Sequence, residues 1–144
     1  MHYLDTAIFL SIHYAETTSK TISVWLKRNS EPLAASAWTL TECASASGIR
    51  VRRGDISATL ATTLLDSIQQ LIHESCLLLP VQQEDYVEAT RWLTNFKLGL
   101  RAGDALHLAV AQRHAATLVS YDSVLLRAAR TLRIPTINPV KVGK

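Results

Sequence analysis

The chain has 144 residues, of which 48% are hydrophobic and 19% are charged. This length is typical of one domain, and the hydrophobic content is sufficient for a sizeable core, which excludes an intrinsically disordered chain. The formal net charge of +3 suits a polyanionic partner without requiring one. The two cysteines, Cys43 and Cys76, are isolated in the sequence, so they predict neither a disulfide framework nor a zinc knuckle, and a reducing cytoplasm is the simplest location.

The N-terminal segment is apolar in places but differs from a signal peptide. It has no basic region before its apolar stretch, and Asp5 lies inside that stretch. No segment of the sequence is long and apolar enough to span a bilayer. With no repeat, low-complexity tract or linker, the chain is expected to be a single cytoplasmic domain over residues 1–144 that does not bind a membrane.

The first part of the chain is predicted to alternate strands with helices. The short apolar segment 2–5 is expected to be a buried strand that ends at its aspartate. Apolar residues at helical spacing predict a helix over 18–28. The small apolar segment 32–37 begins with the proline that ends this helix and is predicted to be a second strand. A helix over 38–53 follows, and Gly54 is expected to terminate it.

The middle of the chain continues this alternation. Asp55 is expected to cap a helix with a regular apolar stripe. The stripe has one apolar residue at every fourth position: Ile56, Leu60, Leu64, Ile68 and Ile72. The continuous apolar run 76–81 is long enough for a strand and too short for a helix. An amphipathic helix is then predicted over 84–96.

The last part of the chain repeats the pattern. A largely apolar helix is predicted within residues 98–115, and Asp104 lies at its start. The run 117–122 is predicted to be a strand that again ends at an aspartate, and a helix over 123–132 follows. The segment 134–140 is predicted to be an edge strand, because its two prolines do not suit a central one.

The predicted strands are continuous apolar runs rather than alternating ones. Such runs are typical of a parallel sheet that is covered on both faces. The sequence therefore predicts an α/β fold, a three-layer α/β/α sandwich with a mainly parallel central sheet.

Four acidic residues are placed by these elements where a ligand would bind. Asp5 and Asp122 follow two predicted strands, and open α/β sheets bind ligands at the carboxyl ends of their strands. Glu42 lies early in the helix after the second strand, and Asp104 lies at the start of its own helix. If the strands are neighbours, the four carboxylates converge, and their repulsion raises their pKa values unless a cation joins them. Oxygen donors suit Mg²⁺ or Mn²⁺, which can activate water for attack on a phosphodiester.

Each acid also has a purely structural interpretation. Asp104 and Asp122 could cap the helices that follow them, since Asp is among the best N-cap residues. Asp5 could form an Asx-turn at the end of its strand, and Glu42 could lie on a solvated helix face. Taken singly, each acid fits its structural interpretation at least as well, so the functional prediction depends on the four together.

Four segments in order resemble a known family. They are YLDTAIFL, ASAWTLTECASA, LRAGDALHLAVA and LVSYDSVLLRAA, and they extend over nearly the whole chain. In their order and acidic content they resemble PIN-domain ribonucleases, and most of all the VapC-type toxins of bacterial toxin–antitoxin pairs. The resemblance implies the same α/β/α sandwich. It also implies metal binding and catalysis by four residues: Asp5, Glu42, Asp104 and Asp122.

The same resemblance has further implications. Thr6 and Ser120 match the small hydroxyl residues beside the first and last acids. Gly103 and Tyr121 depart from the family pattern and leave the substrate preference open. A homodimer is expected, for which the apolar stripe beginning at Ile56 offers surplus surface. A small antitoxin protein that covers the acidic cleft is also implied.

Two residues near Asp104 are candidates for a further role. His107 lies one turn after Asp104 and could bind a metal, but a hydrogen-bonded packing histidine is favoured, because the other donors are all carboxylates. Arg101 lies one turn before Asp104 and is the basic residue expected to contact an RNA backbone. RNA recognition is expected to depend mainly on backbone and shape.

The sequence thus predicts a Mg²⁺-dependent endoribonuclease, with Mn²⁺ as the alternative ion and with RNA, an antitoxin and a second copy of the chain as partners. The alternative is a catalytically silent PIN-like binding or partner subunit. Two other enzyme classes lack their motifs. Ala7 stands where a haloacid-dehalogenase-type phosphatase has its second Asp, and neither a P-loop nor a GxGxxG motif is present.

Overall fold

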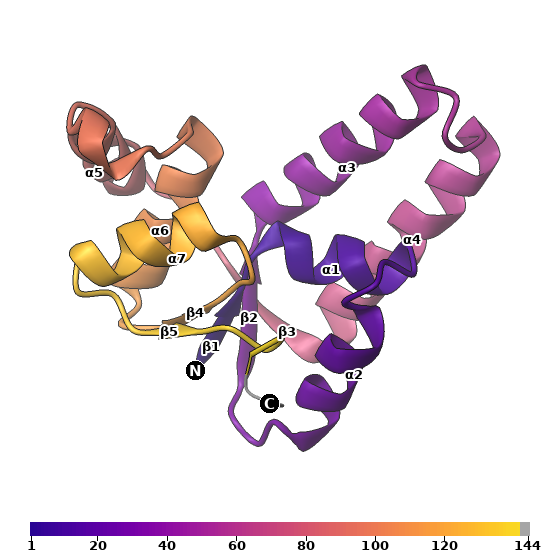
Figure 1. Cartoon of the computed structure of the whole chain (residues 1–144), viewed down its shortest axis with the longest axis horizontal. Helices are drawn as coiled ribbons and strands as arrows, with labels where there is room; N and C mark the ends of the chain where they lie inside the picture. The colour runs from indigo at the N-terminus through magenta and orange to yellow at the C-terminus, as the bar shows by residue number, and fades with distance from the viewer. Residues whose placement is uncertain (142–144) are drawn as a thin grey trace.

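The computed structural model describes residues 1–141 and has a five-stranded sheet at its centre (Figure 1). The strand order is β3-β2-β1-β4-β5. The strands are β1 (His2–Leu4), β2 (Leu33–Ser36), β3 (Cys76–Leu79), β4 (Thr117–Val119) and β5 (Thr136–Ile137). Each adjacent pair is parallel, so the carboxyl ends of all these strands lie at the same edge of the sheet.

Helices cover both faces of this sheet (Figure 1). On one face pack α1 (Thr6–His13), α2 (Ser19–Arg28), α3 (Ala37–Arg52) and α4 (Ala58–Ser75). On the other pack α5 (Gln83–Leu93), the short 3-10 helix η1 (Phe96–Leu98), α6 (Ala102–Arg113) and α7 (Ser123–Thr131). Within residues 1–141, none of the helices has the length and apolarity that crossing a membrane requires.

Successive strand residues point into two separate cores. On β1, Tyr3 packs into the core under α5, α6 and α7, whereas Leu4 packs into the core under α1 to α4. Ala34 and Ala35 of β2 divide in the same way. A strand that is buried on both faces needs apolar residues at every position, which explains the continuous apolar runs in the sequence. The predicted three-layer α/β/α sandwich is confirmed.

The sequence prediction omits α1. Asp5 ends β1, and its carboxylate accepts a hydrogen bond from the Ala7 amide at 3.4 Å, so Asp5 is the N-cap of α1. Ile8 and Phe9 of this helix are fully buried. Because the apolar run of the strand continues directly into the helix, the sequence has no change of period that would separate the two elements.

The starts of two helices also differ from the prediction. Asp55 does not cap α4, because the helix begins after Ser57, whose hydroxyl accepts a hydrogen bond from the Leu60 amide at 3.1 Å. Asp104 is not the N-cap of α6 either, because that helix begins after Arg101 and Asp104 is its third residue. Gly54, with a φ of +78°, follows the end of α3 as predicted.

The two edges of the sheet are only partly predicted. The proline-flanked strand β5 is an edge strand, as expected. The apolar run of β3 suggested full burial, but β3 is the opposite edge, and Leu77 is 55% exposed. The predicted helix over 84–96 ends at Leu93, and Phe96 lies exposed on η1.

An ion pair with a buried carboxylate connects α5 to α6, the helix that carries Asp104. The Asp85 carboxylate is 1% exposed and accepts hydrogen bonds from the Arg113 guanidinium at 2.8 and 2.9 Å. It also accepts one from the Gln82 amide at the start of α5. Separating the two helices would leave the buried Asp85 carboxylate without its partner, which is costly. The ion pair therefore favours the observed packing of α5 on α6.

Candidate functional site

Asp5 lies at the carboxyl end of the central strand β1. Its side chain is almost fully buried, and the Ser120 hydroxyl donates a hydrogen bond of 2.6 Å to its Oδ2 atom. Burial raises the pKa of Asp5, and the charge of Glu42 adds to this. The nearby His107, the Ser120 hydroxyl and the Ala7 amide act in the opposite direction without cancelling the rise. A charged Asp5 is therefore costly in the absence of a further cation.

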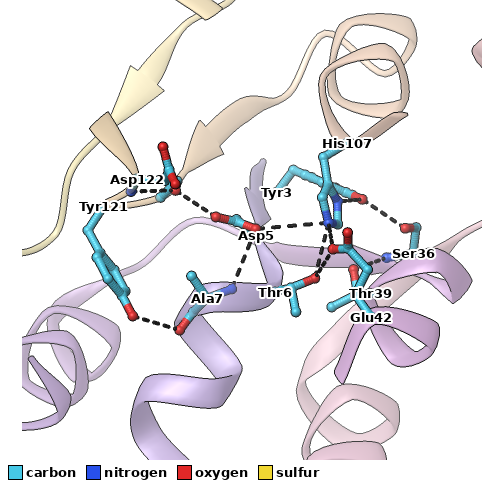
Figure 2. Close-up of polar contacts among 11 residues, drawn as sticks. Tyr3, Asp5, Thr6, Ala7, Ser36, Thr39, Glu42, His107, Tyr121 and Asp122 are labelled. Carbon is cyan, nitrogen blue, oxygen red and sulfur yellow. Dashed lines mark hydrogen bonds and ion pairs between the residues drawn. The ribbon is translucent and has the colours of Figure 1, made fainter. Parts of the chain in front are cut away.

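Glu42 reaches the same place from α3 (Figure 2). Its Oε2 atom accepts a hydrogen bond of 2.7 Å from the Thr6 hydroxyl and lies 2.7 Å from Nε2 of His107. Burial alone would raise the pKa of Glu42, but the hydrogen bond and charge of His107, together with Thr6, outweigh burial and lower it. Glu42 is thus held as a carboxylate.

Gly103 makes room for this carboxylate. A Cβ atom at Gly103 would lie 2.1 Å from Oε1 of Glu42 and 3.2 Å from its carboxyl carbon. No side chain larger than hydrogen fits between α6 and the Glu42 carboxylate in its present place. The departure of Gly103 from the family pattern therefore has a physical reason in this chain.

Asp104 lies one residue further along α6, where the charges of the other three acids act on it. Its Oδ2 atom accepts a hydrogen bond of 3.2 Å from the Arg101 amide. Burial raises the pKa of Asp104, and the charges of Asp5, Asp122 and Glu42 raise it further, against the lowering by the Arg101 amide. The other three predicted acids therefore lie close enough to Asp104 for their charges to raise its pKa.

Asp122 stands beside Asp5 because β4 is paired with β1. It caps α7, and its Oδ1 atom accepts hydrogen bonds from the Val124 and Leu125 amides at 2.7 and 2.9 Å. The Ser120 hydroxyl accepts a hydrogen bond from the Asp122 amide at 3.0 Å while donating to Asp5. The capping interpretation of Asp122 is confirmed, and it leaves the Oδ2 atom available to a ligand.

His107 lies in one cluster with Asp5 and Glu42, a position that the sequence did not predict. The residue is 1% exposed, and its Nε2 atom lies 2.7 Å from Glu42, 3.1 Å from the Thr6 hydroxyl and 3.9 Å from Asp5 (Figure 2). Its Nδ1 atom is hydrogen-bonded to the Tyr3 hydroxyl at 2.8 Å. Burial acts to lower the pKa of His107, but Tyr3, Glu42 and Asp5 outweigh it and raise the pKa to about 10.

The sequence predicted a hydrogen-bonded histidine at this position, and His107 is one, but its partners are site residues. The one-turn spacing from Asp104, together with a tyrosine two residues before Asp5, is the signal that could have placed it at the site.

The donor set suits a divalent cation. Asp5, Glu42 and His107 each present a donor atom within 4.8 Å of the others'. Asp104 and Asp122 are not in this group of three, but they border it from α6 and from the start of α7. Several carboxylates whose charges raise one another's pKa, at the carboxyl edge of a parallel sheet, form an arrangement that Mg²⁺ or Mn²⁺ would stabilise.

The remaining predicted positions flank this cluster. Thr6 and Ser120 each donate to one acid, Glu42 and Asp5 respectively. Arg101 is exposed at the N-cap of α6, and its amide donates to Asp104. The Tyr121 hydroxyl donates to Glu16 at 3.1 Å, so this ring is directed toward the helices on the α1 face.

Comparison with known proteins agrees with the architecture. The family model described as "PIN domain" matches residues 2–131 of the chain. No curated protein matches the chain in sequence.

Several solved structures share the fold. FitAcB from Neisseria gonorrhoeae is 18% identical, with a TM-score of 0.70 over 98% of this chain and 99% of that chain. VapC20 from Mycobacterium tuberculosis, a sarcin–ricin loop cleaving toxin, is 16% identical, with a TM-score of 0.70 over 89% and 95% of the two chains. VapBC2 from Rickettsia felis, bound to a promoter DNA fragment, is 15% identical, with a TM-score of 0.67 over 96% and 98%.

The approach of Glu42 to Gly103 gives a direct test of the site geometry. In Gly103→Ala, the added methyl group should displace the Glu42 carboxylate, whereas the backbone is not strained. We expect Mn²⁺ affinity, measured by calorimetry, to fall roughly tenfold or more. The control is Gly48→Ala on α3, where the added Cβ meets only the end of the Arg52 side chain. Equal Mn²⁺ affinities in the two variants would contradict the assigned place of Glu42.

Proposed function

The chain belongs to the PIN-domain family, and on this basis we propose that it is a metal-dependent endoribonuclease and the toxin of a toxin–antitoxin pair. One observation carries the proposal. Acids that are distant in sequence meet at the carboxyl edge of the sheet, where Asp5, Asp122 and Glu42 all raise the pKa of Asp104. Stability alone does not favour gathering like charges, whereas binding a divalent cation does.

The proposed metal ligands are the four acids of the cleft: Asp5, Glu42, Asp104 and Asp122. Mg²⁺ is the proposed ion, with Mn²⁺ as the alternative. When bound, such an ion lowers the pKa of a water molecule and neutralises charge on a phosphate. Ser120 and Thr6 orient Asp5 and Glu42 through the hydrogen bonds that they donate. The exposed Arg101 would contact the phosphate backbone beside the cleft.

RNA is the proposed substrate, and the cytoplasm is the proposed location. The structural neighbour VapC20 is described as cleaving the sarcin–ricin loop, which supports an RNA substrate. The formal net charge of +3 agrees with a polyanionic substrate. The neighbour VapBC2 is described in complex with promoter DNA, which supports a cognate antitoxin as the second partner. The antitoxin would cover the acidic cleft and keep the toxin inactive.

The catalytic proposal predicts the behaviour of Asp104→Asn. The amide keeps the size of the side chain but removes one negative donor, so RNA cleavage should fall at least about 100-fold, because ligands of one site act as a unit. The measurement is mapping of new RNA 5′ ends after brief induction in a bacterial host. Asp55→Asn, in the exposed connection between α3 and α4, is the matched control and should cut like wild type. Equal cleavage by Asp104→Asn would refute the assignment of Asp104 to the site. No new ends from soluble, folded wild type would instead favour a silent binding subunit.

The charge repulsion predicts a second effect of the same substitution. Because the pKa of Asp104 is raised on folding, ionising this residue costs stability above its unfolded pKa, and the cost grows until the pH exceeds its folded pKa. Metal-free Asp104→Asn should therefore melt about 2–4 °C higher than wild type at pH 7.5. This difference should shrink as the pH falls toward 4. Mg²⁺ should raise the Tm of wild type more than that of the variant, and a lower metal-free Tm of the variant would contradict the repulsion.

A homodimer is the proposed assembly. Leu60 on α4 is 46% exposed, and Ile49 on α3 is exposed as well. The hairpin formed by these two helices extends away from the sheet (Figure 1). Apolar side chains on such a projection are available to a second copy.

Light scattering should give a dimer for wild type and a monomer for Leu60→Asp. The surface change Thr62→Asp is the control and should leave the dimer intact. A wild-type monomer at high concentration would refute the proposal.

A further inference from the structure

The buried His107 has no part in the proposed chemistry, yet it lies at the centre of the site. We infer that His107 is a positioning residue, which holds the Glu42 carboxylate of α3 against α6 so that Glu42 is ready to bind the metal. This inference rests on the proposed function, and neither the resemblance nor the comparisons assign His107 a role.

The orientation of the His107 ring is fixed by a hydrogen bond at Nδ1, the ring nitrogen that does not contact Glu42. Nδ1 of His107 is hydrogen-bonded to the Tyr3 hydroxyl at 2.8 Å, and that hydroxyl is in turn 2.8 Å from Oγ of Ser36 (Figure 2). Tyr3 comes from β1, Ser36 from the end of β2, and all three side chains are buried. A ring held in this way has one orientation, and that orientation aims Nε2 at the acids.

The contacts of Nε2 favour positioning over metal binding. Nε2 lies 2.7 Å from Oε2 of Glu42, which is a hydrogen-bond distance. The Thr6 hydroxyl donates its single hydrogen to Oε2 of Glu42, so the hydrogen in its 3.1 Å contact with Nε2 belongs to Nε2. A ring nitrogen that carries a hydrogen has no lone pair for a metal.

The same contact leaves the other oxygen of Glu42 for a ligand. Oε2 is contacted by Thr6 and His107, whereas Oε1 lies next to Gly103 of α6. A free Glu side chain has several rotamers, and fixing it on binding costs up to about 2 kcal/mol. Holding the side chain in advance removes part of this cost from each metal-binding event.

The test measures Mn²⁺ affinity in three proteins by electron paramagnetic resonance. His107→Ala removes the donor and should bind Mn²⁺ roughly 10–100-fold more weakly than wild type. His107→Gln keeps an N–H group at a similar reach and should recover most of that affinity. His114→Gln, at the end of the same helix, is the control and should bind like wild type. Melting curves without metal show whether each variant is folded.

A second measurement needs no variant. Electron spin-echo modulation of Mn²⁺ bound to the wild-type protein detects a coordinated imidazole nitrogen. A positioning role predicts no directly coordinated nitrogen, and its detection would overturn the inference. Wild-type affinity in His107→Ala would also overturn it, as would a His107→Gln variant that is folded but as weak as His107→Ala. If wild type binds no Mn²⁺, the proposed function fails, and the inference fails with it.

Discussion

The cost of burying carboxylates near one another at one edge of the sheet is the constraint on which the rest of the site depends. Burial raises the pKa of Asp5, and burial and neighbouring acids raise that of Asp104. Neutral hydroxyls and backbone amides offset part of this cost, and His107 offsets more of it at Glu42. What remains is a cost of the metal-free fold that a divalent cation would relieve. Such an arrangement favours ligand binding at the expense of stability.

The topology explains why these particular residues meet. β1 lies between β2 and β4, so the chain leaves β1 toward one side of the sheet and returns on its other side with β4. Open parallel sheets bind ligands at the strand ends beside such a switch of direction. Asp5 and Asp122, far apart in sequence, become neighbours there and share the Ser120 hydroxyl. The helices α3 and α6 then bring Glu42 and Asp104 to the same strand ends.

The sequence was sufficient for the features that follow from local patterns. Apolar runs predicted the strands, and an aspartate at the end of a run marked the edge where the proposed site lies. It was insufficient where a contact between distant segments decides the outcome. The absence of a side chain at Gly103 is explained only once Glu42 of α3 is known to lie against α6. The spacing of His107 from Asp104 could have placed it near the site, but its role depends on contacts with Tyr3 and Glu42 on other elements. The helix α1 was not predicted because its residues continue the apolar run of β1.

The most direct test of the central claim is anomalous diffraction from crystals of the protein soaked in Mn²⁺. We expect Mn²⁺ between Asp5 and Asp104, coordinated by carboxylate oxygens of the cluster and by water, with His107 still hydrogen-bonded to Glu42. Crystals that show no Mn²⁺ among these acids at saturating concentration, or that show it only elsewhere on the surface, would contradict a metal site at this edge of the sheet.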